Sequence, residues 1–167
     1  MSDFTRKDGF FVMSILINWN PRSQAEMEQA MEAYFSTLAA EQAGQFNAML
    51  SPAFVSCDHE TRTLLVRMTV QPWMVNPAGL LHGGIAASMM DFVMGVLSRI
   101  CAGGSMTPTV TMSVDYLRSL RAGDELMAQA WCQKCGRTLS YLTASGWNAR
   151  QPDKIAITAT GTYYTGV

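Results

Sequence analysis

The chain has 167 residues, a length suited to one domain, with 49% hydrophobic and 15% charged residues. Its formal net charge is −1 with no basic stripe, which argues against nucleic-acid binding. Its four cysteines do not suggest a disulfide framework, and the pair Cys132-x-x-Cys135 has no second ligand pair nearby that would indicate a zinc site. We therefore expect a protein with a sizeable core in a reducing cytoplasm.

Residues 1–19 do not follow the pattern of the rest, and we interpret them as an extension that precedes a single domain of residues 20–167. Their apolar run, Phe10–Ile17, is shorter than the roughly 20 residues that a membrane-spanning helix needs. No small-residue cleavage site of a signal peptide follows it promptly. We expect no membrane segment, and we expect the apolar cluster to pack on the domain or on a neighbouring subunit.

A helix is predicted between Asn20 and Gly44. Asn20 followed by Pro21 is typical of a helix start, and Ser23 with Glu26 offers an alternative capping box one turn later. Apolar residues recur at helical spacing along the segment: Met27, Ala30, Met31, Tyr34 and Leu38. This pattern indicates a helix that covers the domain.

Alternation of apolar and polar residues predicts strands from about residue 53 onward. One strand follows a turn at residues 58–62, and its inward positions are Leu64, Val66, Met68 and Val70. Further alternating segments occupy residues 109–117, 126–132, 139–147 and 155–164. Because short turns separate them, we expect an antiparallel sheet.

Residues 85–100 are almost all apolar or small, which predicts a buried helix. Their acidic residue is Asp91, and a carboxylate in such surroundings is costly unless it has partners or a task. His82-Gly83-Gly84 precede the helix, and two glycines allow a sharp turn of the backbone. A helix N-terminus also favours a developing negative charge. The combination predicts chemistry at this helix.

The spacing of Asn76, His82-Gly83-Gly84 and Asp91 resembles that of hotdog-fold thioesterases of the PaaI-like type, named for the phenylacetate pathway. The resemblance continues through residues 109–117 to the turn Gly136-Arg137-Thr138. It implies an α+β hotdog fold, in which an antiparallel sheet wraps around a long central helix. The helix after residue 20 would be an addition to that fold.

The resemblance also implies hydrolysis of an acyl-CoA thioester without a metal or redox cofactor. Asp91 would be the nucleophile or the general base, and the amide of Gly83 would polarise the thioester oxygen. His82 would orient the site, Asn76 would hold water or fix its loop, and Thr109 would position water or substrate. The alternatives are a purely structural role for His82, a loop cap for Asn76 and plain β-propensity for Thr109.

Further residues are candidates for substrate binding: Gly84, Arg118, Arg121, Gly136, Arg137 and Thr138. Guanidinium groups suit the phosphates of coenzyme A, although arginines that only make the surface soluble fit equally well. An apolar pocket for an aromatic or medium-chain acyl group would be lined by Trp73, Met74, Met89, Met90 and Phe92.

Gly83 and Asp91 are eight residues apart, which is about 12 Å along a straight helix. One carbonyl group cannot easily reach both, so we predict active sites shared between the two chains of a two-fold dimer. The resemblance extends this assembly to a tetramer. Two other functions remain open: a hotdog protein that binds an acyl thioester without cleaving it, and a hotdog dehydratase of enoyl or hydroxyacyl thioesters.

Overall fold

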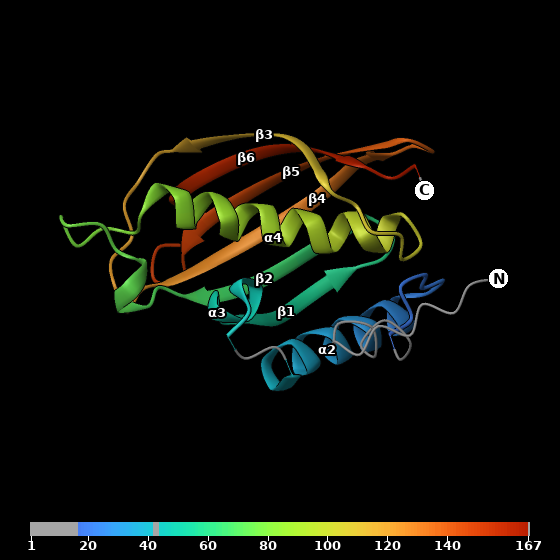
Figure 1. The fold of residues 1–167 in the computed structure, drawn as a ribbon, viewed down its shortest axis with the longest axis horizontal. Helices are drawn as coiled ribbons and strands as arrows, with labels where there is room; N and C mark the ends of the chain where they lie inside the picture. Colours follow the sequence, from blue (N-terminus) through green and yellow to red (C-terminus); the bar gives the residue numbers. More distant parts are fainter. Residues whose placement is uncertain (1–16, 42–43, 167) are drawn as a thin grey trace.

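The computed structural model describes residues 17–41 and 44–166 (Figure 1). One antiparallel sheet has the strand order β1-β2-β4-β5-β6-β3. Its strands are β1 (Pro52–Asp58), β2 (Thr63–Thr69), β3 (Thr109–Tyr116), β4 (Glu125–Cys135), β5 (Leu139–Asn148) and β6 (Ile155–Tyr164). The helices are α2 (Gln24–Glu41), α3 (Phe46–Met49) and α4 (Gly83–Cys101), with a 3-10 turn, η1, at Pro72–Met74.

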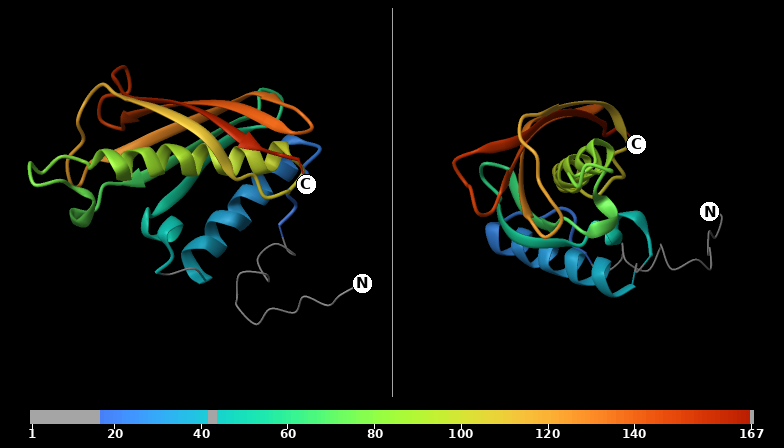
Figure 2. Two further views of the ribbon diagram at one scale, coloured as in Figure 1. Left: turned by 45° about the horizontal axis from the view of Figure 1, so that its top comes forward. Right: turned by 90° about the vertical axis from the view of Figure 1, so that its left-hand side faces the viewer.

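The sheet curves around α4, as the end-on view in Figure 2 shows. The buried side chains of α4 face the inner side of the sheet: Ala86, Met89, Met90, Phe92, Val93, Met94, Val96, Leu97, Ser98 and Ile100. The buried hydroxyl of Ser98 is satisfied by Ser140 of β5, 2.8 Å away. These contacts confirm the predicted α+β arrangement of a wrapped antiparallel sheet around a long apolar helix.

By length and composition alone, the 19-residue helix α4 is apolar enough to cross a membrane, with a mean hydropathy of 1.4 over an 18-residue window. The expectation of no membrane segment considered uninterrupted apolar runs, whereas α4 contains Asp91 and Arg99, and it stays a prediction. More than half of the span, 56%, is buried inside the domain. Packing against the sheet therefore accounts for the apolar composition.

The helix α2 begins later than Asn20 and Pro21 predict. Its N-cap is Ser23, whose hydroxyl accepts a hydrogen bond from the amide of Glu26 at 3.3 Å. The carboxylate of Glu26 accepts from the amide of Arg22 at 2.8 Å. The alternative start is thus the one that the chain uses, with the glutamate reaching one residue further back than in a standard capping box.

Aromatic rings join α2 to α4 and β1. Phe35 meets Phe92 of α4 edge-on at 5.9 Å and lies 6.0 Å from Phe54 of β1, measured between ring centroids. Tyr34 stacks on Phe92 at 6.4 Å and meets Trp19 edge-on at 5.1 Å. Because aromatic rings bury large apolar areas, these contacts fix α2 firmly over the β1 side of the sheet.

The end of the predicted N-terminal extension packs on the domain. Ile17 and Trp19 are buried, and the guanidinium of Arg99 lies 3.9 Å above the centre of the Trp19 ring. Arg99 also donates to the carbonyl of Gly104 at 3.1 Å, so it interacts at the end of α4 and not with Asp91. The predicted apolar cluster within residues 10–16 lies outside the described residues.

Candidate functional site

Asp91 lies near the middle of α4, and its side chain is half-buried. Two hydroxyl groups donate to one of its oxygens, Oδ1: Thr109 Oγ1 at 2.8 Å and Tyr163 OH at 2.9 Å. Within residues 17–41 and 44–166, Oδ2 receives no hydrogen bond. The carboxylate is therefore held through one oxygen, and the other has no hydrogen bond from the described residues.

A β-bulge brings the two hydroxyl groups together. Thr109 of β3 lies opposite Tyr163 of β6, and the register shifts between Thr109 and Thr111. Bulges of this kind re-aim side chains and are common next to active sites. The sequence resemblance had indicated Thr109 but missed Tyr163, whose contact with Asp91 joins residues 72 positions apart.

Tyr163 is 1% exposed, and its ring lies between α4 and the sheet. Burial, and then the negative charge of Asp91, raises the pKa of Tyr163 well above its usual range. The phenol is therefore protonated and acts as a donor to the carboxylate. A signal was present in the sequence: β6 alternates Ile157, Ala159, Gly161 and Tyr163 on its inward side, and Tyr163 supplies the polar group of that row.

The start of α4 forms the second part of the site. His82 is the N-cap, and its Nδ1 accepts a hydrogen bond from the amide of Gly84 at 3.0 Å. The neutral ring then carries its proton on Nε2. In the part of the chain that the structure describes, the amide of Gly83 has no acceptor. The first N–H groups of a helix are unpaired and carry its positive dipole end, so Gly83 is placed to stabilise a negative oxygen.

The two glycines are not needed for a sharp turn, contrary to the sequence expectation. The turn residue with positive φ is Gly79, at 72°, whereas Gly83 and Gly84 begin the helix in ordinary conformations. A methyl group on Gly84 would lie 3.3 Å from the His82 ring, and one on Gly83 would lie 3.5 Å from the Tyr116 ring. Because Gly84 has no side chain, it leaves room for the capping ring of His82. The amide of Gly84 already donates to that ring.

Asn76 fixes the loop that leads into α4. Its Oδ1 accepts from the backbone amides of Ala78 at 2.9 Å and Leu80 at 3.2 Å. The backbone N–H of Asn76 donates to the carbonyl of Leu80 at 2.8 Å. This is the loop-capping alternative of the sequence analysis. The side-chain oxygen of Asn76 already accepts two hydrogen bonds within the chain. The side-chain NH₂ group is therefore the part left to contact water or substrate.

The two parts of the site are far apart within one chain. Gly83 and Asp91 occupy the same uninterrupted helix, and eight residues span about 12 Å along its axis. β3 lies beside both of them. Thr109 at its start bonds to Asp91, and the hydroxyl of Tyr116 at its end donates to the carbonyl of Gly83 at 3.0 Å. One edge strand therefore supports both parts.

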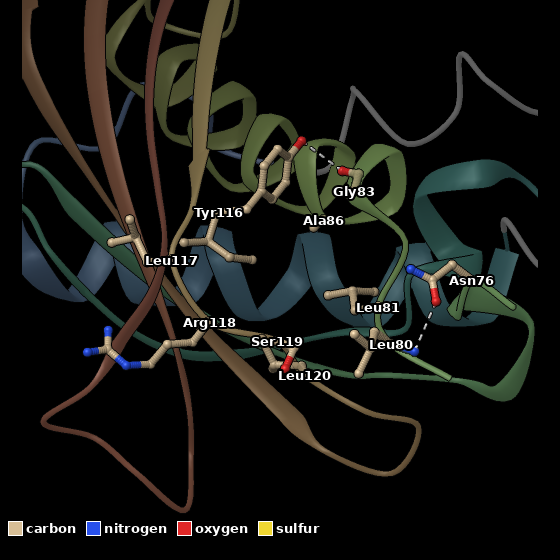
Figure 3. A pocket seen from close by; sticks show the side chains of 11 residues that line it. Asn76, Leu80, Leu81, Gly83, Ala86, Tyr116, Leu117, Arg118, Ser119 and Leu120 are labelled. Atoms are coloured by element: carbon tan, nitrogen blue, oxygen red, sulfur yellow. Dashed lines mark hydrogen bonds between the residues drawn. The ribbon is translucent and has the colours of Figure 1, made fainter. Parts of the chain in front are cut away.

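A cavity of about 300 Å³ adjoins the start of α4 (Figure 3). Its polar lining includes Asn76, Arg118 and Ser119, and Gly83 and Tyr116 also contribute. Its apolar lining comes from Leu80, Leu81, Ala86, Leu117, Leu120 and Ile157. Of the three arginines proposed from the sequence, Arg118 is the one that shares a cavity with Gly83; it donates to the carbonyl of Ile155.

The other substrate-binding candidates lie elsewhere in the chain. The amide of Arg121 donates to Asp124 Oδ2 at 2.8 Å in the turn before β4, and its side chain is exposed. Gly136, Arg137 and Thr138 form the β4–β5 turn, where Thr165 donates to the carbonyl of Gly136 at 2.9 Å. This turn lies near the C-terminal end of α4, since Cys135 contacts Cys101. It does not meet Gly83 within one chain.

The apolar residues expected around an acyl group do not form one surface. Met74, Met89 and Met90 are fully buried in the core, and Phe92 packs against α2. Trp73 is 46% exposed, on the 3-10 turn. Side chains that fill the core have no free surface for a ligand. The interpretation of these five as a pocket was wrong within the single chain.

Residues 78–155 match the model of the thioesterase superfamily. The mouse protein acyl-coenzyme A thioesterase 13 is 28% identical over 78 residues, which are 47% of this chain and 56% of the relative. The chain therefore matches about half the length of this relative. The region that matches the family model contains Gly83, Asp91, Thr109 and Arg118 but neither Asn76 nor Tyr163.

Solved structures share the fold. The PaaI protein of the Escherichia coli phenylacetic acid degradation operon has a TM-score of 0.67 and 23% identity, covering 84% of this chain and 94% of its own. A Streptococcus mutans protein, solved with bound acetyl-CoA, has a TM-score of 0.60 and 26% identity, covering 68% of this chain and 86% of its own. The hotdog fold predicted from the sequence is confirmed, with α2 as an N-terminal helix.

Proposed function

We propose, because residues 78–155 match the model of the thioesterase superfamily, that this chain hydrolyses an acyl-CoA thioester to a free acid and coenzyme A. The observation that carries this proposal is the carboxylate of Asp91, which Thr109 and Tyr163 bind through Oδ1 and whose Oδ2 has no hydrogen bond from the described residues. From this position Oδ2 either attacks the thioester carbon or takes a proton from the attacking water. A single turnover in ¹⁸O-labelled water tests direct attack, since label in the aspartate arises only from an anhydride that water opens at the aspartyl carbon.

The helix start would stabilise the negative charge that develops on the thioester oxygen. The amide of Gly83 has no acceptor among the described residues and points from the positive end of the α4 dipole. With a carboxylate and an amide donor supplied by the protein, hydrolysis requires no metal or redox cofactor. We place the reaction in the cytoplasm.

We further propose that each active site combines Gly83 of one chain with Asp91 of a second copy. A reacting carbon must lie within about 3 to 3.5 Å of its attacking group, whereas the two residues are separated by about 12 Å of one helix. The edge strand β3 is exposed along most of its length and bears Val110 and Tyr116, which are 53% and 54% exposed. This exposed edge supports the proposal, because two copies could pair along it about a two-fold axis; a further pairing of dimers would give a tetramer.

We propose an aromatic or medium-chain acyl group. Support comes from the cavity beside Gly83, which is mostly apolar in lining and, at about 300 Å³, lies at the lower end of ligand-pocket volumes. Arg118 at its border would meet a phosphate of coenzyme A. The acetyl-CoA bound by the Streptococcus mutans protein supports coenzyme A as the carrier.

The direct test is a panel of acyl-CoAs of graded size, with free coenzyme A measured by mass spectrometry. We expect release of coenzyme A with a maximum for aromatic or medium-chain groups. Binding of the panel without any release would favour the non-catalytic hotdog protein. Addition or removal of water across a double bond, with the thioester intact, would identify the dehydratase instead.

The shared site is tested by mixing two inactive chains. Gly83→Pro removes one N–H and fits the structure, since proline is favoured at the first helical position and His82 before it is extended, with ψ 132°. Gly83→Ala keeps the N–H and is the matched control. Co-assembled Gly83→Pro and Asp91→Ala chains should regain one working site in each mixed dimer. Mixed dimers that remain inactive would place both groups of a site in one chain.

A further inference from the structure

A second cavity, of about 410 Å³, lies at the end of α4 opposite to Gly83. Figure 1 shows that the start of α2, the turn between β1 and β2 and the end of α4 meet at this end of the molecule, and each of them contributes to the lining. Its volume falls within the range of small-molecule sites. The proposed hydrolysis uses no residue of this cavity, since Asp91 lies about 15 Å back along the helix from Cys101.

The wall formed by the β1–β2 turn is held in place by hydrogen bonds to the start of α2. His59 Nε2 lies 3.2 Å from the carbonyl of Pro21 and donates to it, because a carbonyl group only accepts. The amide of His59 donates to Gln24 Oε1 at 2.8 Å, and Gln24 Nε2 donates to the carbonyl of Cys57 at 2.8 Å. The cavity is therefore formed before any ligand enters it.

Part of the lining is apolar. Met27 of α2 is 1% exposed and Ile100 of α4 is 8% exposed, and both border the cavity. Pro21 and Cys101 add to this surface. An apolar group of a ligand would be removed from water at these side chains, which favours binding.

Two side chains of opposite charge, Glu60 and Arg62, also line the cavity. Both are exposed, and among residues 17–41 and 44–166 neither of them forms an ion pair. Cys101, the last residue of α4, lines the same cavity, and the carbonyl end of a helix favours a positive charge. A ligand that carries both a carboxylate and an ammonium group can satisfy both side chains, whereas a ligand with one charge also meets a like charge.

The backbone of Arg62 gives a separate reason to expect a task for its side chain. Its φ is 51°, in the left-handed region that favours glycine. Its carbonyl accepts from the amide of Cys132 at 3.0 Å, so strand pairing holds the residue in this conformation. Glycine would adopt it without strain. An arginine here has a conformational cost that a role in binding would explain.

We propose that this cavity binds an α-amino acid with an apolar side chain. The carboxylate of the amino acid pairs with the guanidinium of Arg62, whose planar fork suits a group with two oxygens. The ammonium group contacts Glu60, and the apolar side chain lies on Met27 and Ile100. The proposal goes beyond thioester hydrolysis and does not rest on it.

The test measures binding of L-leucine, L-methionine and L-phenylalanine to the full-length protein by isothermal titration calorimetry. We expect one site per chain and a Kd below about 1 mM for at least one of the three. The matched controls are analogues of the tightest ligand without its ammonium or its carboxylate group; for leucine these are 4-methylpentanoate and 3-methylbutylamine. Each analogue should bind about tenfold more weakly, the effect of losing one hydrogen-bonded charge.

Two variants test the charged side chains. Arg62→Gly removes the guanidinium and suits the positive φ, so it should abolish binding without lowering the melting temperature. Glu60→Gln should weaken binding about tenfold. Arg150→Gln and Glu32→Gln change exposed residues outside the cavity and should bind the amino acid as the wild type does.

Failure of all three amino acids to bind would overturn the proposal. An analogue with one charge that binds as tightly as its amino acid would overturn the assignment of a zwitterion. Unchanged binding to Arg62→Gly or to Glu60→Gln would place the ligand outside this cavity. None of these results bears on Asp91, so loss of the amino-acid site and loss of thioester hydrolysis are distinguished by separate assays.

Discussion

The two edges of the sheet differ in what covers them. The β1 edge is covered by α2, whose Tyr34 and Phe35 pack inward, and no element among the described residues covers the β3 edge (Figure 1). The proposed catalytic groups all lie towards the uncovered edge: Thr109 belongs to β3, and Asp91 and Gly83 are bonded to it. The chain therefore covers the edge that is remote from the proposed site, and among the described residues the edge beside that site has no cover.

The largest effect is expected for Asp91→Asn, which keeps the hydrogen bonds to Oδ1 but removes the basic oxygen. We expect kcat/KM to fall about 10³-fold, within the range for removal of a general base. Glu32→Gln, an exposed acid on α2, is the control on the covered side and should be neutral. Near wild-type hydrolysis by Asp91→Asn, with an unchanged circular dichroism spectrum, would remove Asp91 from the mechanism.

A charge on the uncovered edge should disrupt assembly. Ser113 is exposed in the middle of β3, and Ser113→Lys would bring like charges together in a two-fold pairing of this strand. We expect a monomer in sedimentation velocity and a fall in kcat of about 10²-fold, comparable to the loss of one oxyanion donor. Ser56→Lys, at an exposed serine of β1, is the matched control. A Ser113→Lys dimer with full activity would exclude β3 as the interface.

The support of Asp91 by hydroxyl groups should have a smaller effect. Tyr163→Phe keeps the buried ring and removes one of two donors to Oδ1. We expect kcat to fall about tenfold with little change in KM, since one hydrogen bond to a charged group contributes about 1.5 kcal/mol or more. Thr109→Val removes the other donor. Because both act on one oxygen, the double variant should not show the product of the single effects. Strict multiplicativity would indicate independent roles.

The smallest effect on hydrolysis is expected on the covered side. Phe35→Ala removes a ring that is 5% exposed and should lower the free energy of unfolding by about 3 to 5 kcal/mol. The kcat of the folded protein should change less than about twofold, because α2 does not touch the catalytic groups. Phe46→Ala, at a ring that is 48% exposed, should leave the melting temperature unchanged. A large fall in kcat for Phe35→Ala would show that α2 shapes the site.

Local patterns predicted what depends on neighbouring residues. The helix α4 and the alternating strands follow from their periodicity, and the spacing of Asn76, the glycines and Asp91 indicated the site. The start of α2 was predicted one turn too early, because Asn20 and Ser23 are both good capping residues and only packing decides between them.

Contacts between distant segments were beyond local patterns. Tyr163 reaches Asp91 only because β6 pairs with β3 in one register and a bulge follows Thr109. The same applies to Cys135, whose thiol meets the carbonyl of Cys101 only because the end of β4 lies beside the end of α4. For Gly83 and Gly84 the error was of another kind. Glycine permits an unusual backbone conformation, and the sequence analysis assumed that these two residues adopt one, which they do not.

The position of β3 has a consequence for how the protein should be assayed. This strand bonds to Asp91 through Thr109 at its start and to Gly83 through Tyr116 at its end. A partner that pairs with β3 would therefore lie along both of these residues. In the shared-site arrangement a lone chain keeps its carboxylate in place but lacks the opposing amide. Specific activity would then fall on dilution, and the concentration of half-maximal activity would measure the dissociation constant of the dimer.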